Sequence, residues 1–160
     1  MIYIISDTHF GHSNIIKLGE RPFTDKQDME DKLIDNWNKT ISNKDLIYHL
    51  GDFALGNSEY IESILQKLNG RKILIKGNHD AKSCKWYMER GFEIALDSGI
   101  LLEDKYLLTH KPTNIENSKF INIHGHLHQK TIGSEYYFNA SVELIGYKPI
   151  LFDSIKEIIS

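Results

Sequence analysis

The sequence RKILIKGNHD, residues 71–80, joins an apolar run to a cluster of polar side chains. Residues 71–76 are typical of a buried strand, because the run is short, continuous and rich in isoleucine and leucine. The turn that ends such a strand needs the glycine and tolerates the asparagine, but it requires neither His79 nor Asp80. Taken alone, GNHD therefore predicts a turn and a helix cap, and the rest of the chain decides whether it does more.

Similar apolar runs, many of them rich in β-branched or aromatic residues, predict strands along the rest of the chain. These strands are expected at residues 2–6, 46–50, 92–96, 100–103, 106–110, 120–124 and 136–138. The runs at 100–103 and 106–110 are close enough in sequence to form a hairpin.

Periodic apolar positions and capping residues predict helices between these strands. The segment TDKQ, residues 24–27, has the form of a capping box, and the residues after it place Leu33 and Trp37 on one face. The other helices are expected to begin at Asn57 or Ser58 and end at Gly70, to cover residues 81–90, and to begin near Asp153.

Strands alternate with helices in the first half of the chain and dominate the second half, which predicts an α/β sandwich with mixed sheets. No repeat, low-complexity tract or linker interrupts the 160 residues. We therefore expect residues 1–160 to form a single domain that buries a sizeable core.

The composition limits the kinds of partner that the chain is expected to have. Its formal net charge is −3, so it has no basic excess that would hold a nucleic-acid backbone, and a nucleic acid is not expected as a bulk ligand. One cysteine, Cys84, cannot form an internal disulfide, which favours a reducing compartment. The apolar start is too short for a signal peptide, and no run is long enough to span a membrane. We expect a cytoplasmic protein.

Polar residues follow the predicted strands at the points where these strands end. They are Asp7, His9, Asp52, Asn78, His110, His126 and His128. In α/β sheets, ligands bind outside the carboxyl ends of the strands, so we expect these side chains to meet at one place.

This set of side chains indicates a metal site. Carboxylate, imidazole and amide groups without a thiol suit manganese, iron, cobalt, nickel or zinc. The candidates are too many for one open tetrahedral site, but they fit two ions about 3.5–4 Å apart that share a ligand. Asp52 is the natural bridging carboxylate. In an extended chain, Asp7 and His9 would point to the same side, as would His126 and His128.

These motifs resemble those of the calcineurin-like metallophosphoesterases. The resemblance rests on DTH at 7–9, GD at 51–52, GNHD at 77–80, His110 and GHLH at 125–128, in the family's order and each after a predicted strand. The sequences SDTHFGHSNII (6–16) and RPF (21–23) are similar to those of small stand-alone members from bacteria and phages. The resemblance implies a β-sandwich of mixed sheets flanked by helices, in four layers of α/β/β/α.

The resemblance also implies a role for each residue. Asp7, His9 and His128 would hold one ion; Asn78, His110 and His126 would hold the other; and Asp52 would bridge them. The ions would be manganese first, with iron, nickel, cobalt or zinc as alternatives. A water activated by both ions would attack phosphorus, and His79 would protonate the leaving oxygen, with Asp80 as a partner that orients its imidazole. The expected substrate is a small phosphate ester, with a phosphodiester or nucleotide derivative as the first choice.

Several roles stay open at the level of sequence. His12 would contact substrate phosphate, support a metal ligand or be a surface histidine, and Arg21 would be a phosphate clamp or a solvated loop residue. Asn78 is also a candidate substrate contact. Asp80 would cap a helix at residue 81 as readily as it would orient His79. His49 is expected in the core, His124 in a structural or supporting role, and residues 10–23 and 111–119 around the substrate pocket.

Other functions are weighed against the leading one. A non-catalytic scaffold on the same fold is disfavoured because every ligand position is filled. A nuclease is disfavoured because the chain has no basic patch, and a phosphomonoesterase remains an alternative to the diesterase. A protein phosphatase is disfavoured because residues 51–56, GDFALG, lack the Asp-Arg pair of that branch.

Overall fold

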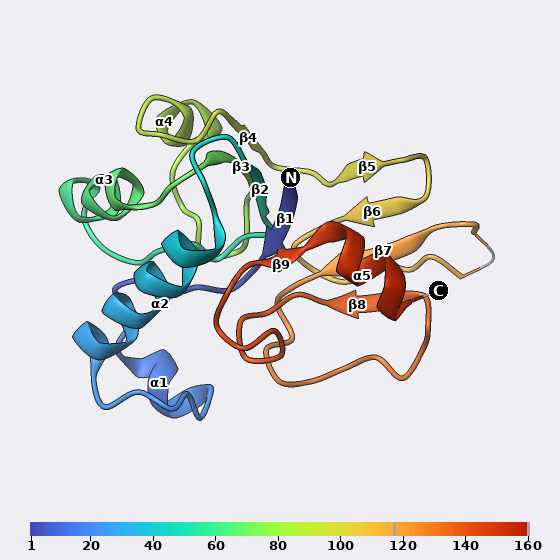
Figure 1. Cartoon of the computed structure of the whole chain (residues 1–160), viewed down its shortest axis with the longest axis horizontal. Coiled ribbons are helices and arrows are strands. Elements are labelled where there is room, and N and C mark those ends of the chain that lie inside the picture. The colour runs from blue at the N-terminus through green and yellow to red at the C-terminus, as the bar shows by residue number, and fades with distance from the viewer. Residues whose placement is uncertain (117, 160) are drawn as a thin grey trace.

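Two β-sheets lie face to face in the computed structural model, which describes residues 1–116 and 118–159 (Figure 1). The first sheet has the strand order β4-β3-β2-β1-β9, and the second has the order β5-β6-β7-β8. The strands are β1 (Ile2–Ile5), β2 (Leu46–His49), β3 (Arg71–Ile75), β4 (Ile94–Leu96), β5 (Ile100–Leu102), β6 (Tyr106–Leu108), β7 (Ile121–His124), β8 (Tyr137–Asn139) and β9 (Ile150–Leu151). The helices are α1 (Asn14–Leu18), α2 (Lys26–Thr40), α3 (Ser58–Lys67), α4 (Cys84–Met88) and α5 (Phe152–Ile158).

Both sheets are mixed, as predicted. Strands β1 to β4 run parallel, and β9 joins β1 in the antiparallel direction. In the second sheet β6, β7 and β8 run parallel, and β5 forms the predicted antiparallel hairpin with β6. Because β1, β2 and β3 are parallel neighbours, the turns that follow them lie at the same edge of the sheet.

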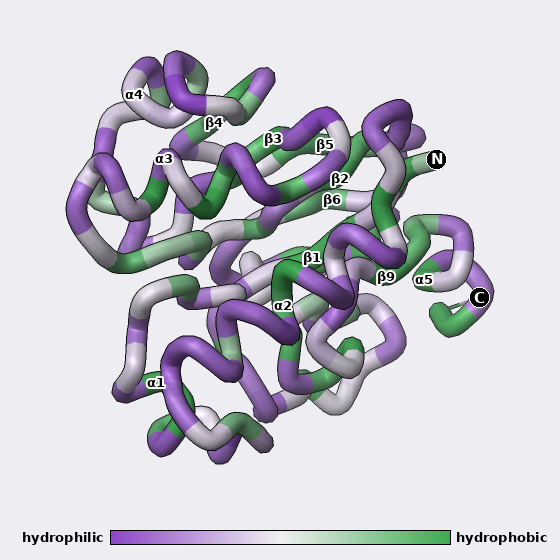
Figure 2. The backbone as a smooth tube through the Cα atoms, turned by 60° about the vertical axis from the view of Figure 1, so that its left-hand side comes forward, coloured by the Kyte–Doolittle hydropathy of each residue, from purple (hydrophilic) through white to green (hydrophobic). Residues whose placement is uncertain are grey.

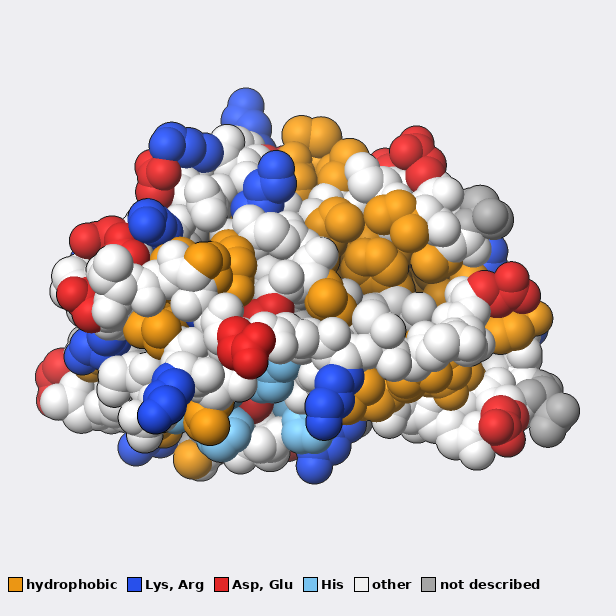
Figure 3. Space-filling view, turned by 90° about the horizontal axis from the view of Figure 1, so that it is seen from below, with side chains coloured by type: hydrophobic (Ala, Val, Ile, Leu, Met, Phe, Trp, Pro, Cys, Tyr) orange, Lys and Arg blue, Asp and Glu red, His pale blue; other side chains and the backbone are white. Residues whose placement is uncertain are grey.

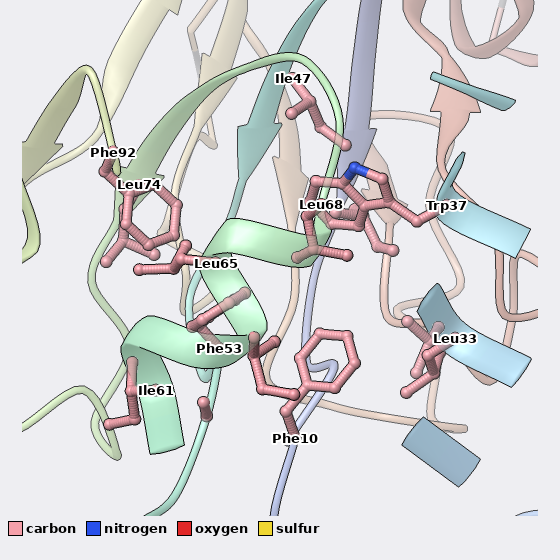
Figure 4. Packing of buried hydrophobic residues seen from close by; sticks show 14 of the residues in the cluster. Phe10, Leu33, Trp37, Ile47, Phe53, Ile61, Leu65, Leu68, Leu74 and Phe92 are labelled. Carbon is pink, nitrogen blue, oxygen red and sulfur yellow. The ribbon is translucent and has the colours of Figure 1, made fainter. Parts of the chain in front are cut away.

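Helices α2 and α3 pack on the outer face of the first sheet. Trp37 of α2 and Leu65 of α3 meet Ile47 and Leu74 from the strands, all four almost fully buried (Figure 4). The Trp37 indole N–H donates to the Asn69 carbonyl at 3.0 Å, which satisfies the one polar atom that this side chain brings into the core. Hydrophobic residues run along the strands, while hydrophilic residues recur on the turns of the helices (Figure 2).

A second apolar cluster fills the space between the sheets. Ile4 and Ile73 from the first sheet meet Tyr106 and Ile123 from the second. Buried side chains of α5 join the same cluster, and α5 lies against β1 and β9. The sandwich of two mixed sheets flanked by helices is therefore confirmed.

Some boundaries differ from the prediction. The cap of α2 is Asp25, one residue after the predicted start of the capping box, and its carboxylate accepts the Asp28 N–H at 2.9 Å. Asn57 caps α3, as one of the two alternatives predicted. The helix expected at 81–90 is the shorter α4, which Ser83 caps, so Asp80 is not its cap.

Three further points complete the comparison with the predicted elements. Helix α1 and strand β9 were not predicted, because each is too short for a periodic signal. Residue 117, inside the loop predicted at 111–119, lies outside the described residues. Among the helices of the described residues, none combines the length and the apolar character needed to cross a membrane.

The packing on β3 leads to a stability prediction. Leu74 is 0% exposed, so Leu74→Ala should lower the free energy of unfolding by about 2–5 kcal/mol, because it removes buried methyl groups and leaves a cavity. Leu101→Ala is the control, since this leucine is 42% exposed and should cost less than about 1 kcal/mol. Urea denaturation measures both, and equal losses in the two variants would contradict the assigned burial.

Candidate metal centre

The seven predicted ligands lie together at the carboxyl ends of the strands. Potential ligand atoms of Asp7, His9 and His128 lie within 4.8 Å of one another, and those of Asp52, His110 and His126 form a second such group. Asn78 joins the second group, because its Oδ1 lies 3.0 Å from Nε2 of His110. On the surface, histidine side chains lie close together on one face of the molecule, next to acidic side chains and with basic side chains to either side (Figure 3).

Left-handed backbone at the strand ends brings these side chains together. The φ angles of Asp7, His9, Asp52, His126 and His128 lie between 51° and 69°. Asp7 and His9 lie in one group, as expected, but extended chain does not bring them together, because both residues have left-handed backbone. The same expectation for His126 and His128 is wrong for the same reason. Non-glycine residues adopt this region at a cost, and such strain gathers at functional sites.

Glycines allow the second and third turns to approach each other. Gly51 has φ +97°, and a Cβ built on it would lie 2.5 Å from the Gly77 nitrogen. A Cβ on Gly77 would lie 2.2 Å from Oδ1 of Asp52. The glycines in GD and GNHD are thus required because the two turns contact each other closely, whatever backbone conformation each turn needs.

The Asp52 carboxylate faces both groups of ligands. Its Oδ2 lies 3.5 Å from Nε2 of His9 and 3.5 Å from Nε2 of His110. Its Oδ1 accepts the backbone N–H of His79 at 2.9 Å, which fixes the orientation of the carboxylate. One oxygen is therefore placed between the two groups, as a bridging ligand requires.

Two buried atoms of the first group have no hydrogen-bond partner. Asp7 Oδ2 accepts from the His126 N–H at 2.9 Å and the Ser141 hydroxyl at 3.0 Å, whereas Oδ1 is buried without a partner. This Oδ1 lies 3.9 Å from Nε2 of His9 and 3.9 Å from Nε2 of His128. Nε2 of His9 is also without a partner. A cation between them would satisfy these atoms, since buried polar atoms otherwise need hydrogen bonds.

The second group also contains acceptor atoms that a cation would satisfy. Nδ1 of His110 donates to the Leu50 carbonyl at 2.7 Å, so Nε2 of a neutral imidazole carries a lone pair. That lone pair faces the Asn78 carbonyl oxygen at 3.0 Å, which is also an acceptor. Two facing acceptors are favourable when a cation binds both, and the donor set therefore fits two divalent cations.

Two residues support this centre in ways that the sequence did not indicate. Glu143 accepts from Nδ1 of His128 at 2.9 Å, which directs Nε2 of that histidine toward Asp7. Arg21 donates to Glu143 at 2.7 Å and to the Asp7 carbonyl at 2.7 Å. In the sequence, the only feature that could have indicated a buried role for Glu143 is its position directly after the small residues 140–142, which the structure buries.

Both sequence interpretations of Arg21 are wrong. The residue is 4% exposed, so it is not a solvated loop residue. Its guanidinium makes five hydrogen bonds to protein atoms, which matches the five N–H donors that an arginine has. No donor is left for a substrate phosphate, because Arg21 serves to hold the backbone and Glu143.

Burial shifts the pKa values of some groups at the centre, and hydrogen bonds shift those of others. Burial lowers the pKa of His9 to about 2, so this imidazole is neutral at pH 7 and able to bind a cation. Burial also raises the pKa of Asp7. Burial alone would raise the pKa of Glu143, but the hydrogen bond from His128 and the charge of Arg21 outweigh it and lower that pKa. The hydrogen bond to Glu143 in turn raises the pKa of His128.

His79 and Asp80 lie in different surroundings. The His79 side chain is 47% exposed, and its Nε2 lies 4.0 Å from Oδ2 of Asp52. Asp80 is 3% exposed and accepts the backbone N–H groups of Gly77, Asp52 and Phe53 at 2.7, 2.7 and 3.0 Å. The prediction that Asp80 orients the His79 imidazole is therefore wrong, because its carboxylate is used to join two turns.

The remaining histidines occupy three kinds of position. His12 lies beside the centre, with its Nδ1 3.4 Å from Nδ1 of His9. His49 is fully buried in the core, accepts the Gly51 N–H at Nδ1 and contacts the Thr8 hydroxyl through Nε2. His124 is also fully buried, and its Nδ1 donates to the Gly125 carbonyl at 2.8 Å.

Two hollows flank the centre. One, of about 470 Å³, is lined by His79, His12, Ile15 and Leu18, together with residues 126–130 and His9. The other, of about 490 Å³, lies on the Asn78 side and is lined by Lys76, Lys111 and Thr113, among others. Four residues of the segment 10–23 line the first hollow, and residues 111–113 line the opposite one, so the two segments predicted around a substrate pocket lie at different hollows.

The contacts of Asp80 lead to a prediction. Burial raises the pKa of this carboxyl to about 6. Asp80→Asn would turn one acceptor into an N–H₂ group that faces a backbone donor, and should lower the free energy of unfolding by about 1–3 kcal/mol. Asp31→Asn on the exposed side of α2 is the control and should change it by less than about 0.5 kcal/mol. Unchanged stability of Asp80→Asn in urea would exclude a structural role.

Comparisons with known proteins agree with this geometry. A family model of calcineurin-like phosphoesterases matches residues 1–153. The uncharacterized protein MJ1445 of Methanocaldococcus jannaschii is 38% identical over 170 residues, which cover 99% of this chain and 90% of that protein.

Two solved structures are similar in fold. The protein of unknown function AQ665 from Aquifex aeolicus has a TM-score of 0.77 and 31% identity, over 99% of this chain and 98% of that chain. The nuclease MPE from Pseudomonas putida has a TM-score of 0.50 and 18% identity, over 79% of this chain and 60% of that chain, a likeness of fold alone. Because the family model extends over nearly the whole length, the chain belongs to the calcineurin-like phosphoesterases.

Proposed function

We propose that the chain is a two-metal phosphoesterase that hydrolyses a small phosphate ester, with a phosphodiester or nucleotide derivative as the preferred substrate. The observation that carries this proposal is the position of Asp52 Oδ2, which lies 3.5 Å from the Nε2 atoms of His9 and His110. A carboxylate oxygen shared by two groups of ligands is the arrangement that two neighbouring cations need.

Seven residues would hold the ions in the two groups described above, with manganese as the first candidate and iron, nickel, cobalt or zinc as alternatives. Asp7, His9 and His128 would serve one ion; Asn78, His110 and His126 the other; and Asp52 both. When bound, the two cations would neutralise phosphate charge and lower the pKa of water at the site.

His79 would act as the general acid. Its side chain is 47% exposed in the same hollow as His9 and His128, so it can reach a substrate oxygen, whereas the buried ligands cannot move toward one. Its backbone N–H donates to Asp52, which holds the His79 backbone beside the carboxylate, and its Nε2 lies 4.0 Å from Oδ2 of Asp52. A proton delivered to the leaving oxygen is typically worth about 10²–10⁴-fold in rate.

The two hollows favour a diester over a monoester. A phosphodiester has two substituents on phosphorus, and the centre has space on the His79 side and on the Asn78 side. Asn78 lines the second hollow, which supports its candidate role as a substrate contact. A phosphomonoester would leave one of these spaces without a substrate group.

Other functions have less support. The Pseudomonas putida neighbour is a nuclease, but it shares only the fold, and a net charge of −3 does not favour a long nucleic acid as partner. A non-catalytic scaffold would not need an exposed histidine beside the bridging carboxylate. A cytoplasmic location remains our expectation from the sequence.

The first test compares two chromogenic esters. Protein stripped of metal and then given manganese should hydrolyse bis-p-nitrophenyl phosphate faster than p-nitrophenyl phosphate. Asp52→Asn should lose nearly all turnover, because both ions would lose their shared carboxylate. Metal content by atomic absorption accompanies the assay, and a near wild-type rate of Asp52→Asn with normal metal content would show that the bridge is misassigned.

A second test concerns the proton donor. His79→Ala should leave manganese content unchanged and should slow diesters with poor leaving groups by about 10²–10⁴-fold, with a much smaller effect on p-nitrophenyl esters. The physical reason is that a poor leaving group needs a proton in the transition state. The slope of log rate against leaving-group pKa is the measurement, and an equal loss for all leaving groups would exclude the general-acid role.

A further inference from the structure

The orientation of His9 restricts where its single proton lies. Its Nε2 lies 3.5 Å from Oδ2 of Asp52 and 3.9 Å from Oδ1 of Asp7, and it has no hydrogen-bond partner. An Nε2 that binds a cation carries a lone pair, so the proton of a neutral His9 must then lie on Nδ1. Metal-binding histidines usually donate this second N–H to a nearby acceptor, which orients the ring.

The acceptor for that proton is another histidine. Nδ1 of His9 lies 3.4 Å from Nδ1 of His12, in hydrogen-bonding geometry. If Nδ1 of His12 accepts, the proton of a neutral His12 must lie on Nε2. The tautomer of His12 therefore follows from metal binding at His9.

Hydrogen bonds and a close backbone contact fix the turn between the two histidines. Phe10 is 0% exposed and its carbonyl accepts the Leu55 N–H at 2.7 Å. Gly11 has φ +79°, and a Cβ on it would lie 2.2 Å from the Leu55 carbonyl oxygen. The His12 N–H donates back to the His9 carbonyl at 3.1 Å. The chain is thus fixed from Phe10 to His12.

His12 also lies where a substrate would bind. It lines the same hollow as His79, and the ring centroids of these two histidines are 6.1 Å apart. Its ring is only partly covered, unlike that of His9, which is 2% exposed. A donor on His12 therefore has access to the space beside the proposed general acid.

We propose that His12 is a substrate-contacting residue whose Nε2–H donates to a phosphate oxygen, and that its Nδ1 accepts from His9 and so orients this metal ligand. This inference rests on the proposed two-metal site. It gives His12 two separate tasks on its two ring nitrogens, and each task can be removed by itself.

Two amide substitutions separate the tasks. In His12→Asn, the carboxamide oxygen can take the position of Nδ1, so the acceptor for His9 is kept and the substrate donor is lost. In His12→Gln, the longer side chain can place its N–H₂ near the position of Nε2, so the donor is kept and the acceptor is lost. Ser13→Ala is the matched control, since the Ser13 side chain is exposed and makes no capping hydrogen bond.

Calorimetry of manganese with the apoprotein, and of inorganic phosphate with manganese-saturated protein, gives two affinities for each variant. His12→Asn should bind manganese within about twofold of wild type and phosphate about tenfold more weakly, because a hydrogen bond to a charged group is lost. His12→Gln should bind manganese about tenfold more weakly, because its ligand is no longer oriented, and phosphate within about threefold. Ser13→Ala should match wild type in both.

Equal losses in both variants, or no loss in either, would overturn the proposal. The wild-type protein offers a test that does not depend on the folding of variants. Histidine ¹⁵N spectra of zinc-loaded protein should show His12 with its proton on Nε2, and a proton on Nδ1 would also overturn the proposal. If wild type binds manganese and phosphate but hydrolyses no ester, the proposed function fails while these affinities still decide the role of His12.

Discussion

The carboxylate of Asp80 determines how closely the ligand-bearing turns approach. It accepts backbone N–H groups from Gly77 on one turn and from Asp52 and Phe53 on the other. Buried N–H groups must be paired, so the protein folds only if the two turns lie close enough for one carboxylate to accept from both. Glycines at the start of both turns remove the Cβ atoms that would prevent the approach. The position of Asp52 between the two groups of ligands depends on this arrangement.

A second buried network holds the other side of the centre. The Arg21 guanidinium joins the backbone after β1 to Glu143, and Glu143 in turn accepts from His128. A buried ion pair contributes to stability only when its remaining donors and acceptors are satisfied. All five donors of Arg21 are used, so the network orients one histidine and fixes the turn that carries Asp7. Arg21 and Glu143 are 122 residues apart in the chain, so the centre is complete only in the folded protein.

The architecture explains why strained residues gather at one place. Parallel strands bring their carboxyl ends to the same edge, and apolar clusters on both faces of the first sheet hold those ends in position. That packing can compensate the cost of left-handed backbone at five candidate ligands. The result is a set of imidazoles and carboxylates that face one another, including buried atoms of Asp7 and His9 that have no hydrogen-bond partner. The residues fit divalent cations, which would satisfy the buried atoms of Asp7 and His9 that no protein group satisfies.

The sequence by itself determined every strand except β9, the mixed sandwich and the identity of the candidate ligands. These depend on local signals: apolar runs, turn residues and the types of side chain that follow each strand. Only the tertiary structure decided the roles of Asp80, Arg21 and Glu143, and the contact between His9 and His12. These residues contact backbone groups and side chains, and most of the partners lie on other turns. No spacing in the sequence therefore predicts these contacts. A ligand can be recognised by its chemistry, whereas a residue that supports a ligand is defined by the groups that folding places next to it.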